Sequence, residues 1–160
     1  MTNDDENDTI DSGGKNIMFD SKKAAKILDK QQPVSQDIIT RVKNKLAEKA
    51  VILDQSEEWD RFLMQRGAEA VTLAPGDVII MHTKVSASGF YEELIHYGQL
   101  KRGTVNTESK RDIIQKEIEA QEKLIKYQKA YKITDYEIEV LKNNLEHYRI
   151  KLEIIINGGI

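Results

Sequence analysis

The sequence predicts a mostly helical α+β domain, and three observations carry that prediction. Apolar residues recur every three or four positions over most of the chain beyond residue 34, which is the period of an amphipathic helix. One short run rich in β-branched residues, at 77–83, follows a proline and has the composition of a strand. Charged residues make up 32% and apolar residues 39% of the 160 residues, which is typical of a globular domain with much exposed helical surface.

Residues 1–32 differ in composition from the rest of the chain. The first 16 residues hold five acidic side chains against one lysine, and only two of them are apolar. Such a segment buries too little apolar surface to offset the entropy that ordering would cost. We therefore expect a flexible acidic leader over 1–32, with a short helix over 19–32 that Pro33 closes, and then a single domain over 33–157.

Two helices are predicted between residues 35 and 67. Ser35 and Ser56 can cap them, because a serine hydroxyl accepts a hydrogen bond from a free amide of the first helical turn. Glutamates follow Ser56 directly, where carboxylates favour the helix dipole, and Gly67 ends the second helix. The predicted apolar faces consist of Ile38, Ile39, Val42, Leu46 and Ala50 in the first helix and Trp59, Phe62 and Leu63 in the second.

The chain then changes from the helical period to short apolar runs. Two runs that contain β-branched residues, 70–73 and 78–83, flank Pro75 and Gly76. A Pro-Gly pair between two such runs is a turn signal. We therefore expect either a β-hairpin or a loop that leads into one strand at 77–83.

Three more helices are expected, at 90–100 with an end near Gly103, at about 109–131, and in a last segment that starts after Thr134. The last helix has the clearest start, because Thr134 and Glu137 have the spacing of a capping box. Apolar residues then follow at alternating spacings of three and four. These patterns predict a helical hairpin over 109–152. For the tail, 153–160, they allow either a strand or a fraying end.

The net charge of −3 and the absence of cysteine limit the functions that the chain can have. A pI of about 5.7 gives no basic surface for a nucleic-acid backbone, so we expect no nucleic-acid partner. Any metal site must use His, Asp or Glu. No run approaches the ~18 apolar residues of a membrane span, and the acidic N-terminus differs from a signal peptide. We therefore expect a chain that is cytoplasmic when synthesised and has no membrane partner.

The segment 89–99 contains the strongest candidate for chemistry. Glu92 and His96 are four residues apart and would project from one face of a helix, with Glu93 beside them. The known pattern is His-Glu-x-x-His, in which both histidines bind zinc and the glutamate is the general base for a metal-bound water. Here Glu92 stands in place of the first histidine. The same trio on a surface helix is also typical of a solvated face, and both interpretations stay open.

A second acidic helical segment lies at 116–122. Together with the strand at 77–83, the segment from Glu92 to His96 and the capped last helix, it resembles the zincin-like metallopeptidase domains found in phage structural proteins and bacterial polymorphic toxins. The resemblance covers roughly residues 68–152. It implies a single zincin-like domain in which the strand at 77–83 is the edge that aligns an extended substrate.

The resemblance also implies a role for each site residue. His96 and Glu119 would bind a divalent metal, with zinc expected first, and Glu92 would stand where the first histidine stands. Glu93 would be the general base. Helix periodicity favours Glu117 instead of Glu119, because Glu117 shares the apolar face of its helix. We expect Glu119, because the Glu-Ala adjacency falls there and because a ligand must face a cleft and not a packed core.

The implied function is a metal-dependent peptidase that acts on a peptide or protein substrate, as part of a virion or as an effector delivered to a target cell. His82 would be either a half-exposed strand residue or a hydrogen-bond partner of the substrate backbone. A carboxylate at Glu92 suits harder ions than zinc, such as manganese or calcium, and a degenerate site that binds nothing is an open alternative. The other alternative is a non-catalytic interaction module that uses the apolar stripe of the helical hairpin.

Overall fold

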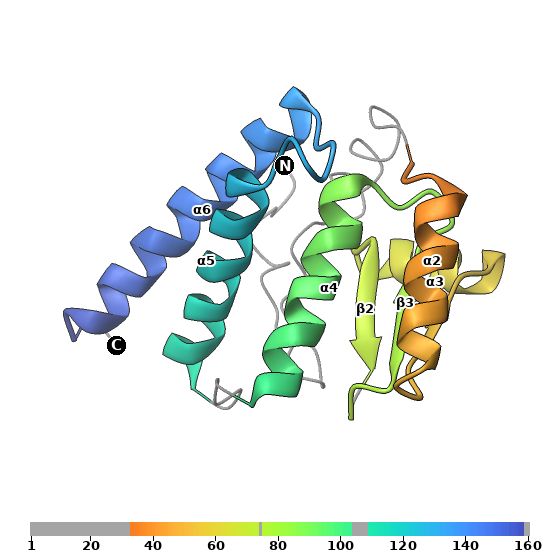
Figure 1. The fold of residues 1–160 in the computed structure, drawn as a ribbon. Helices are drawn as coiled ribbons and strands as arrows, with labels where there is room; N and C mark the ends of the chain where they lie inside the picture. The colour runs from red at the N-terminus through yellow and green to blue at the C-terminus, as the bar shows by residue number, and fades with distance from the viewer. Residues whose placement is uncertain (1–32, 74, 104–108, 159–160) are drawn as a thin grey trace. The chain divides into compact units, whose positions relative to one another are not determined.

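The computed structural model describes residues 33–73, 75–103 and 109–158 (Figure 1). Within these ranges the elements are α2 (Gln36–Ala47), β1 (Ile52–Asp54), α3 (Glu57–Gln65), β2 (Ala70–Leu73), β3 (Val78–Met81), α4 (Ala87–Arg102), α5 (Lys110–Lys126) and α6 (Asp135–Ile156). The predicted mostly helical α+β class, with strands ahead of α4 and a C-terminal helical pair, is confirmed. The predicted leader and its short helix lie at 1–32, outside the described residues.

The chain divides into two compact units, and the division falls inside α4. One unit ends at Glu93 and the other begins at Leu94. The first unit therefore contains the sheet, α2, α3 and the start of α4. The second contains the rest of α4 together with α5 and α6.

The first unit is built on a three-stranded sheet with the order β1-β3-β2. β3 pairs in parallel with β1 and antiparallel with β2, and the second pairing places Val71 opposite Ile80 and Leu73 opposite Val78. The hairpin alternative for the Pro-Gly segment is thereby confirmed. The expectation that the strand at 77–83 is an edge was wrong, because β3 has a neighbour on each side; β1 and β2 are the edges of the described sheet.

β3 takes the central position because it is apolar on both faces. Ile79, Ile80 and Met81 are each 0% exposed. A continuous apolar run is typical of a strand that is covered on both sides, whereas a half-exposed strand alternates apolar and polar residues. Ile80 packs in a cluster with Leu63 of α3 and Val71 of β2, which fixes α3 against the sheet.

Capping residues start four of the helices, and they are Ser35, Ser56, Ser109 and Thr134. In each case the side-chain oxygen accepts a hydrogen bond from the amide three residues later, which confirms the caps predicted at Ser35, Ser56 and Thr134 and adds one at Ser109. Gly67, just after α3, has a φ of 67°, which a glycine adopts without strain. α5 ends at Lys126, earlier than the predicted Tyr131, and turns follow up to Lys132.

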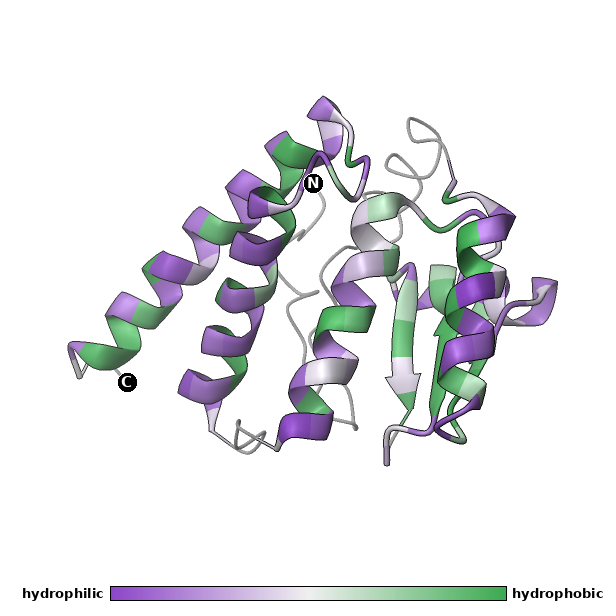
Figure 2. Ribbon diagram, viewed as in Figure 1, coloured by the Kyte–Doolittle hydropathy of each residue, from purple (hydrophilic) through white to green (hydrophobic). Residues whose placement is uncertain are grey.

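In the second unit, α5 and α6 lie side by side as a helical hairpin (Figure 1). The apolar side chains that they bury are Ile113, Ile114, Ala120 and Leu124 on α5 and Ile138, Leu141, Leu145 and Tyr148 on α6. Polar and apolar colours alternate along both helices in Figure 2, as expected where one face is buried. α6 continues to Ile156, so most of the ambiguous tail is helical. None of the described helices combines the length and the apolar character needed to cross a bilayer.

Candidate metal centre

The start of α4 is fixed by a buried carboxylate. Ser86, directly before the helix, accepts a hydrogen bond through Oγ from the Gly89 amide at 3.2 Å. The hydroxyl and the amide of Ser86 both donate to the carboxylate of Glu69, at 2.9 Å each, and Glu69 is only 5% exposed. A carboxylate at this position also favours the helix dipole. α4 thus begins at Ala87, earlier than the predicted Phe90, with its first turn held in place.

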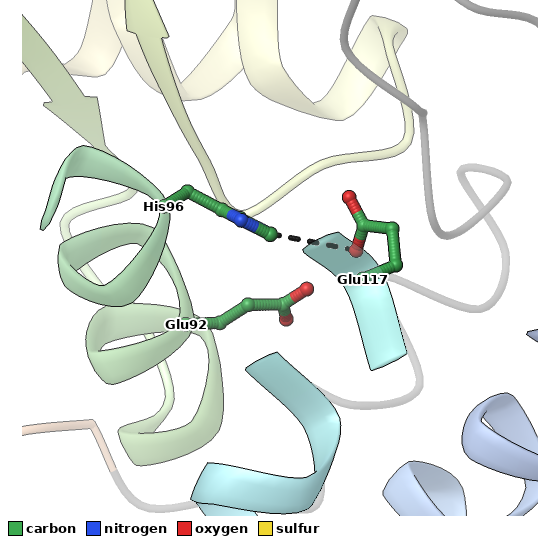
Figure 3. Close-up of side chains that lie close together, drawn as sticks. All are labelled: Glu92, His96 and Glu117. Atoms are coloured by element: carbon green, nitrogen blue, oxygen red, sulfur yellow. Dashed lines mark ion pairs between the residues drawn. The ribbon is translucent and has the colours of Figure 1, made fainter. Parts of the chain in front are cut away.

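Three side chains from α4 and α5 converge on one point (Figure 3). Glu92 and His96 lie one turn apart on α4, which is a single continuous helix, and Glu117 lies on α5. Each offers one ligand atom, and these atoms all lie within 4.8 Å of one another. His96 Nε2 is 3.4 Å from Glu117 Oε2, the ion pair drawn as a dashed line in Figure 3. Both glutamates are buried and the histidine is half-buried.

Glu117 carries a buried carboxylate oxygen that stands out in this group. Within the part of the chain that the structure describes, its fully buried Oε2 atom has no hydrogen-bond partner, and the residue is 5% exposed. A carboxylate oxygen that is removed from water without a compensating partner destabilises the fold. The nearby His96 nitrogen, at 3.4 Å, is beyond the usual length of an N–H···O hydrogen bond. A cation bound among the three side chains would remove this deficit.

The donor atoms suit a divalent metal in both distance and charge. Zinc binds carboxylate oxygen and imidazole nitrogen at about 2.0–2.2 Å, which at a tetrahedral angle places two donors roughly 3.4 Å apart. The distance from His96 Nε2 to Glu117 Oε2 is 3.4 Å. Two carboxylates carry two negative charges, so a doubly charged ion balances them, whereas a proton on His96 balances only one. The group can therefore hold a divalent cation, and its two oxygen donors also accept a harder ion such as manganese.

A buried glutamine holds the imidazole of His96. Nδ1 of His96 lies 2.8 Å from Oε1 of Gln99, and Nε2 of Gln99 donates to the carbonyl of Lys116 at 3.1 Å. Gln99 is 1% exposed. Sequence reasoning missed this residue, because its amide carries no charge and because its partner carbonyl belongs to another helix. Spacing alone gives a weak signal, namely a polar residue one turn after a candidate ligand.

Glu119, which we expected as the third ligand, lies on another side of α5. Its side chain is 54% exposed and pairs with Arg102 at 3.3 Å. Two residues span about 200° of rotation round a helix, so Glu117 and Glu119 cannot face the same point. The residue that the structure brings to Glu92 and His96 is Glu117, the alternative that the helical period favours.

Glu93, which we expected as the general base, is buried next to the sheet. Its Oε1 atom accepts a hydrogen bond from Thr72 Oγ1 at 2.6 Å, and both residues are 6% exposed. Thr72 lies on β2, an edge strand of the described sheet. Glu93 therefore faces about 100° away from Glu92 round α4, towards β2. Its carboxylate is not one of the two, those of Glu92 and Glu117, that converge with His96.

His82 is buried directly after β3, so the expectation of a half-exposed strand residue was wrong. Its Nδ1 atom accepts a hydrogen bond from the Lys84 amide at 2.9 Å. Burial lowers the pKa of His82, and the carboxylate of Asp60, 3.7 Å away, opposes that shift only in part. The imidazole is therefore neutral near neutral pH and takes part in a turn. Contact with a substrate stays a prediction for this residue.

Nothing among protein-family models, curated proteins or solved structures matches this chain. The zincin-like resemblance thus rests on its short sequence blocks. Independently of that resemblance, the described residues contain a buried Glu-His-Glu group, Glu92, His96 and Glu117, that can hold a metal ion within a mostly helical α+β fold.

Proposed function

We propose that this protein is a metal-dependent peptidase whose metal is held by Glu92, His96 and Glu117. The observation that carries the proposal is the buried Oε2 atom of Glu117, which finds no hydrogen-bond partner among the described residues and faces the imidazole of His96 at 3.4 Å. Structural carboxylates in a core are normally hydrogen-bonded or paired. A buried acidic oxygen that faces a second ligand atom is instead the arrangement that a metal-binding side chain needs.

The zincin-like resemblance assigns the parts of peptide hydrolysis to a bound cation and to Glu93. A bound divalent cation contributes Lewis acidity towards a peptide carbonyl and towards water. Glu93, adjacent in the chain to Glu92, would take the proton from the attacking water and pass it to the leaving amine. Thr72 donates a hydrogen bond to Glu93 at 2.6 Å and holds it towards β2, so in this proposal the side chain leaves Thr72 to reach the water. The choice of a peptide as the substrate comes from the zincin-like resemblance.

The experiment separates metal binding from catalysis. The protein is stripped with a chelator and reloaded with Zn²⁺ or Mn²⁺, and cleavage of an unbiased peptide library is followed by mass spectrometry. We expect cleavage only after reloading. The Glu93→Gln variant should bind metal like the wild type and lose about 10²–10⁴-fold of the rate, which is the usual contribution of a general base.

The matched control for this experiment is Glu119→Gln, which removes an exposed carboxylate from the neighbouring helix and should leave both metal binding and cleavage unchanged. Equal cleavage by the metal-free protein would refute the proposal. Equal cleavage by the Glu93→Gln variant would remove Glu93 as the base.

A non-catalytic interaction module is the second candidate, and one observation favours it. The C-terminal end of α6 exposes three isoleucines, Ile150, Ile154 and Ile156, which are 49%, 47% and 55% exposed. Apolar side chains gathered on a protein surface often mark a site of protein contact. Metal binding without cleavage of any peptide in the library would favour this second function.

A further inference from the structure

We infer that Gln99 is a positioning residue that fixes the tautomer of His96 and thereby turns the unprotonated Nε2 of the neutral ring towards Glu117. The inference rests on the proposed function, because Gln99 would position His96 for a metal. The hydrogen bonds from which it is argued do not depend on a metal. Gln99 is 1% exposed and contacts both ligand-bearing helices, since its own position is on α4 and Lys116 is on α5.

The first step is the orientation of the Gln99 amide. A carbonyl oxygen can only accept hydrogen bonds, so the group that lies 3.1 Å from the Lys116 carbonyl must be the NH₂ end of the amide. The oxygen end of the same amide then faces His96, with Oε1 at 2.8 Å from Nδ1. The Lys116 carbonyl therefore determines which atom of Gln99 meets the imidazole.

The second step is the tautomer of His96. Because Oε1 of Gln99 can only accept, Nδ1 of His96 must carry a proton and donate it. In the neutral ring the other nitrogen, Nε2, then has no proton and presents a lone pair. This nitrogen lies 3.4 Å from Oε2 of Glu117. In the neutral ring two acceptor atoms thus face each other, which is unfavourable unless a proton or a metal ion lies between them.

The opposite tautomer would suit a purely structural role. With its proton on Nε2, a neutral His96 could donate to Glu117 and satisfy the buried carboxylate with no metal. The hydrogen bond with Gln99 disfavours the tautomer that has its proton on Nε2. Metal-binding histidines commonly donate their second N–H to a carbonyl or carboxylate, and this contact sets both the tautomer and the ring orientation. Lys116 directly precedes Glu117, so Gln99 also connects the histidine to the helical turn that carries the other ligand.

The tautomer can be measured in the metal-free protein. Long-range ¹H–¹⁵N correlations of the imidazole rings are recorded on full-length, ¹⁵N-labelled, chelator-treated protein at pH 8, and His96 is assigned with His→Gln variants of the three histidines. We expect the proton of His96 on Nδ1 in the wild type. Gln99→Leu should move it to Nε2, and Gln99→Glu, which keeps an acceptor beside Nδ1, should retain the wild-type tautomer.

Metal affinity provides the second readout. Loss of such a supporting contact typically weakens binding 10–100-fold, so we expect the Kd for Zn²⁺ to rise by about that factor in Gln99→Leu. Gln115→Leu is the matched control, because Gln115 is an exposed glutamine on α5, and it should change neither readout. Circular dichroism checks that each variant is folded.

The outcomes separate this inference from the proposed function. A wild-type His96 with its proton on Nε2, or a tautomer that Gln99→Leu leaves unchanged, would overturn the role of Gln99. A wild-type protein with the proton on Nδ1 that binds no metal would support the positioning role and would overturn the metal-dependent function instead.

Discussion

At the scale of single residues, Gly89 is where one added methyl group would meet a buried charge. A Cβ atom at this position would lie 2.8 Å from Oε2 and 2.9 Å from Cδ of Glu69. That carboxylate cannot move aside without losing its hydrogen bonds from Ser86. Overpacking costs about 1–3 kcal/mol, and the gain of helix propensity from Gly to Ala is about 1 kcal/mol. We expect Gly89→Ala to lower the free energy of unfolding by about 1 kcal/mol in urea denaturation.

Gly98→Ala is the matched control, because it makes the same substitution on the same helix. The nearest atom to a Cβ at Gly98 is Nη1 of Arg102, at 3.5 Å, an ordinary contact. Helix propensity then dominates, and the free energy of unfolding should rise by about 0.5–1 kcal/mol. If both variants were stabilised equally, Glu69 would not occupy the space beside Gly89.

Single residues also explain which part of the site could be predicted. The spacing of Glu92 and His96 placed them on one face of a helix, and the structure brings both to Glu117. The helical period favours Glu117 as well, but a position on the apolar face is also typical of a core residue, and the Glu-Ala adjacency favours Glu119. A glutamate in an apolar stripe is costly unless it has a partner, so the position of Glu117 indicates a partner side chain or ion near it.

At the scale of elements, the capping box of α6 makes the most direct prediction. Thr134 Oγ1 accepts from the Glu137 amide at 3.2 Å, and Oε2 of Glu137 accepts from the Thr134 amide at 2.9 Å. Glu137 is 2% exposed, so loss of the hydroxyl also removes a contact from a buried carboxylate. We expect Thr134→Ala to reduce the free energy of unfolding by about 1–2 kcal/mol, measured by urea denaturation with circular dichroism.

Thr134→Ser provides the control for this prediction, because serine keeps the hydroxyl and is an equally good cap. Its free energy of unfolding should stay within about 0.5 kcal/mol of the wild type. A serine variant as unstable as the alanine variant would show that the methyl group of Thr134, and not the cap, stabilises the start of α6.

The elements differ in how far their sequences determine them. The helices were predicted because their signals are local, namely a cap, a period of three or four residues and a glycine end. β1 was missed because it has only three residues, Ile52–Asp54, of which Ile52 is 59% exposed. It forms a strand because it pairs with β3, which lies far from it in the sequence. The zincin-like resemblance implies an edge position for the strand at 77–83, whereas the pairing with β1 gives β3 a neighbour on each side.

At the scale of the whole molecule, α4 is the element that belongs to both compact units. Its first turn is fixed by Glu69, and its later turns carry His96 and Gln99. The α+β class could be predicted because it depends on the sum of many local patterns. The Gln99 contact could not, since it depends on how two helices pack.

The most direct test of the central claim, that Glu117 completes a metal site with Glu92 and His96, is a calorimetric titration of the metal-stripped protein with Zn²⁺. The comparison is between Glu117→Gln and Glu119→Gln, the same change at a buried and at an exposed position of one helix. We predict about one equivalent bound by the wild type and by Glu119→Gln, and binding at least about tenfold weaker in Glu117→Gln. A wild type that binds no metal, or equal affinities in the two variants, would contradict the account.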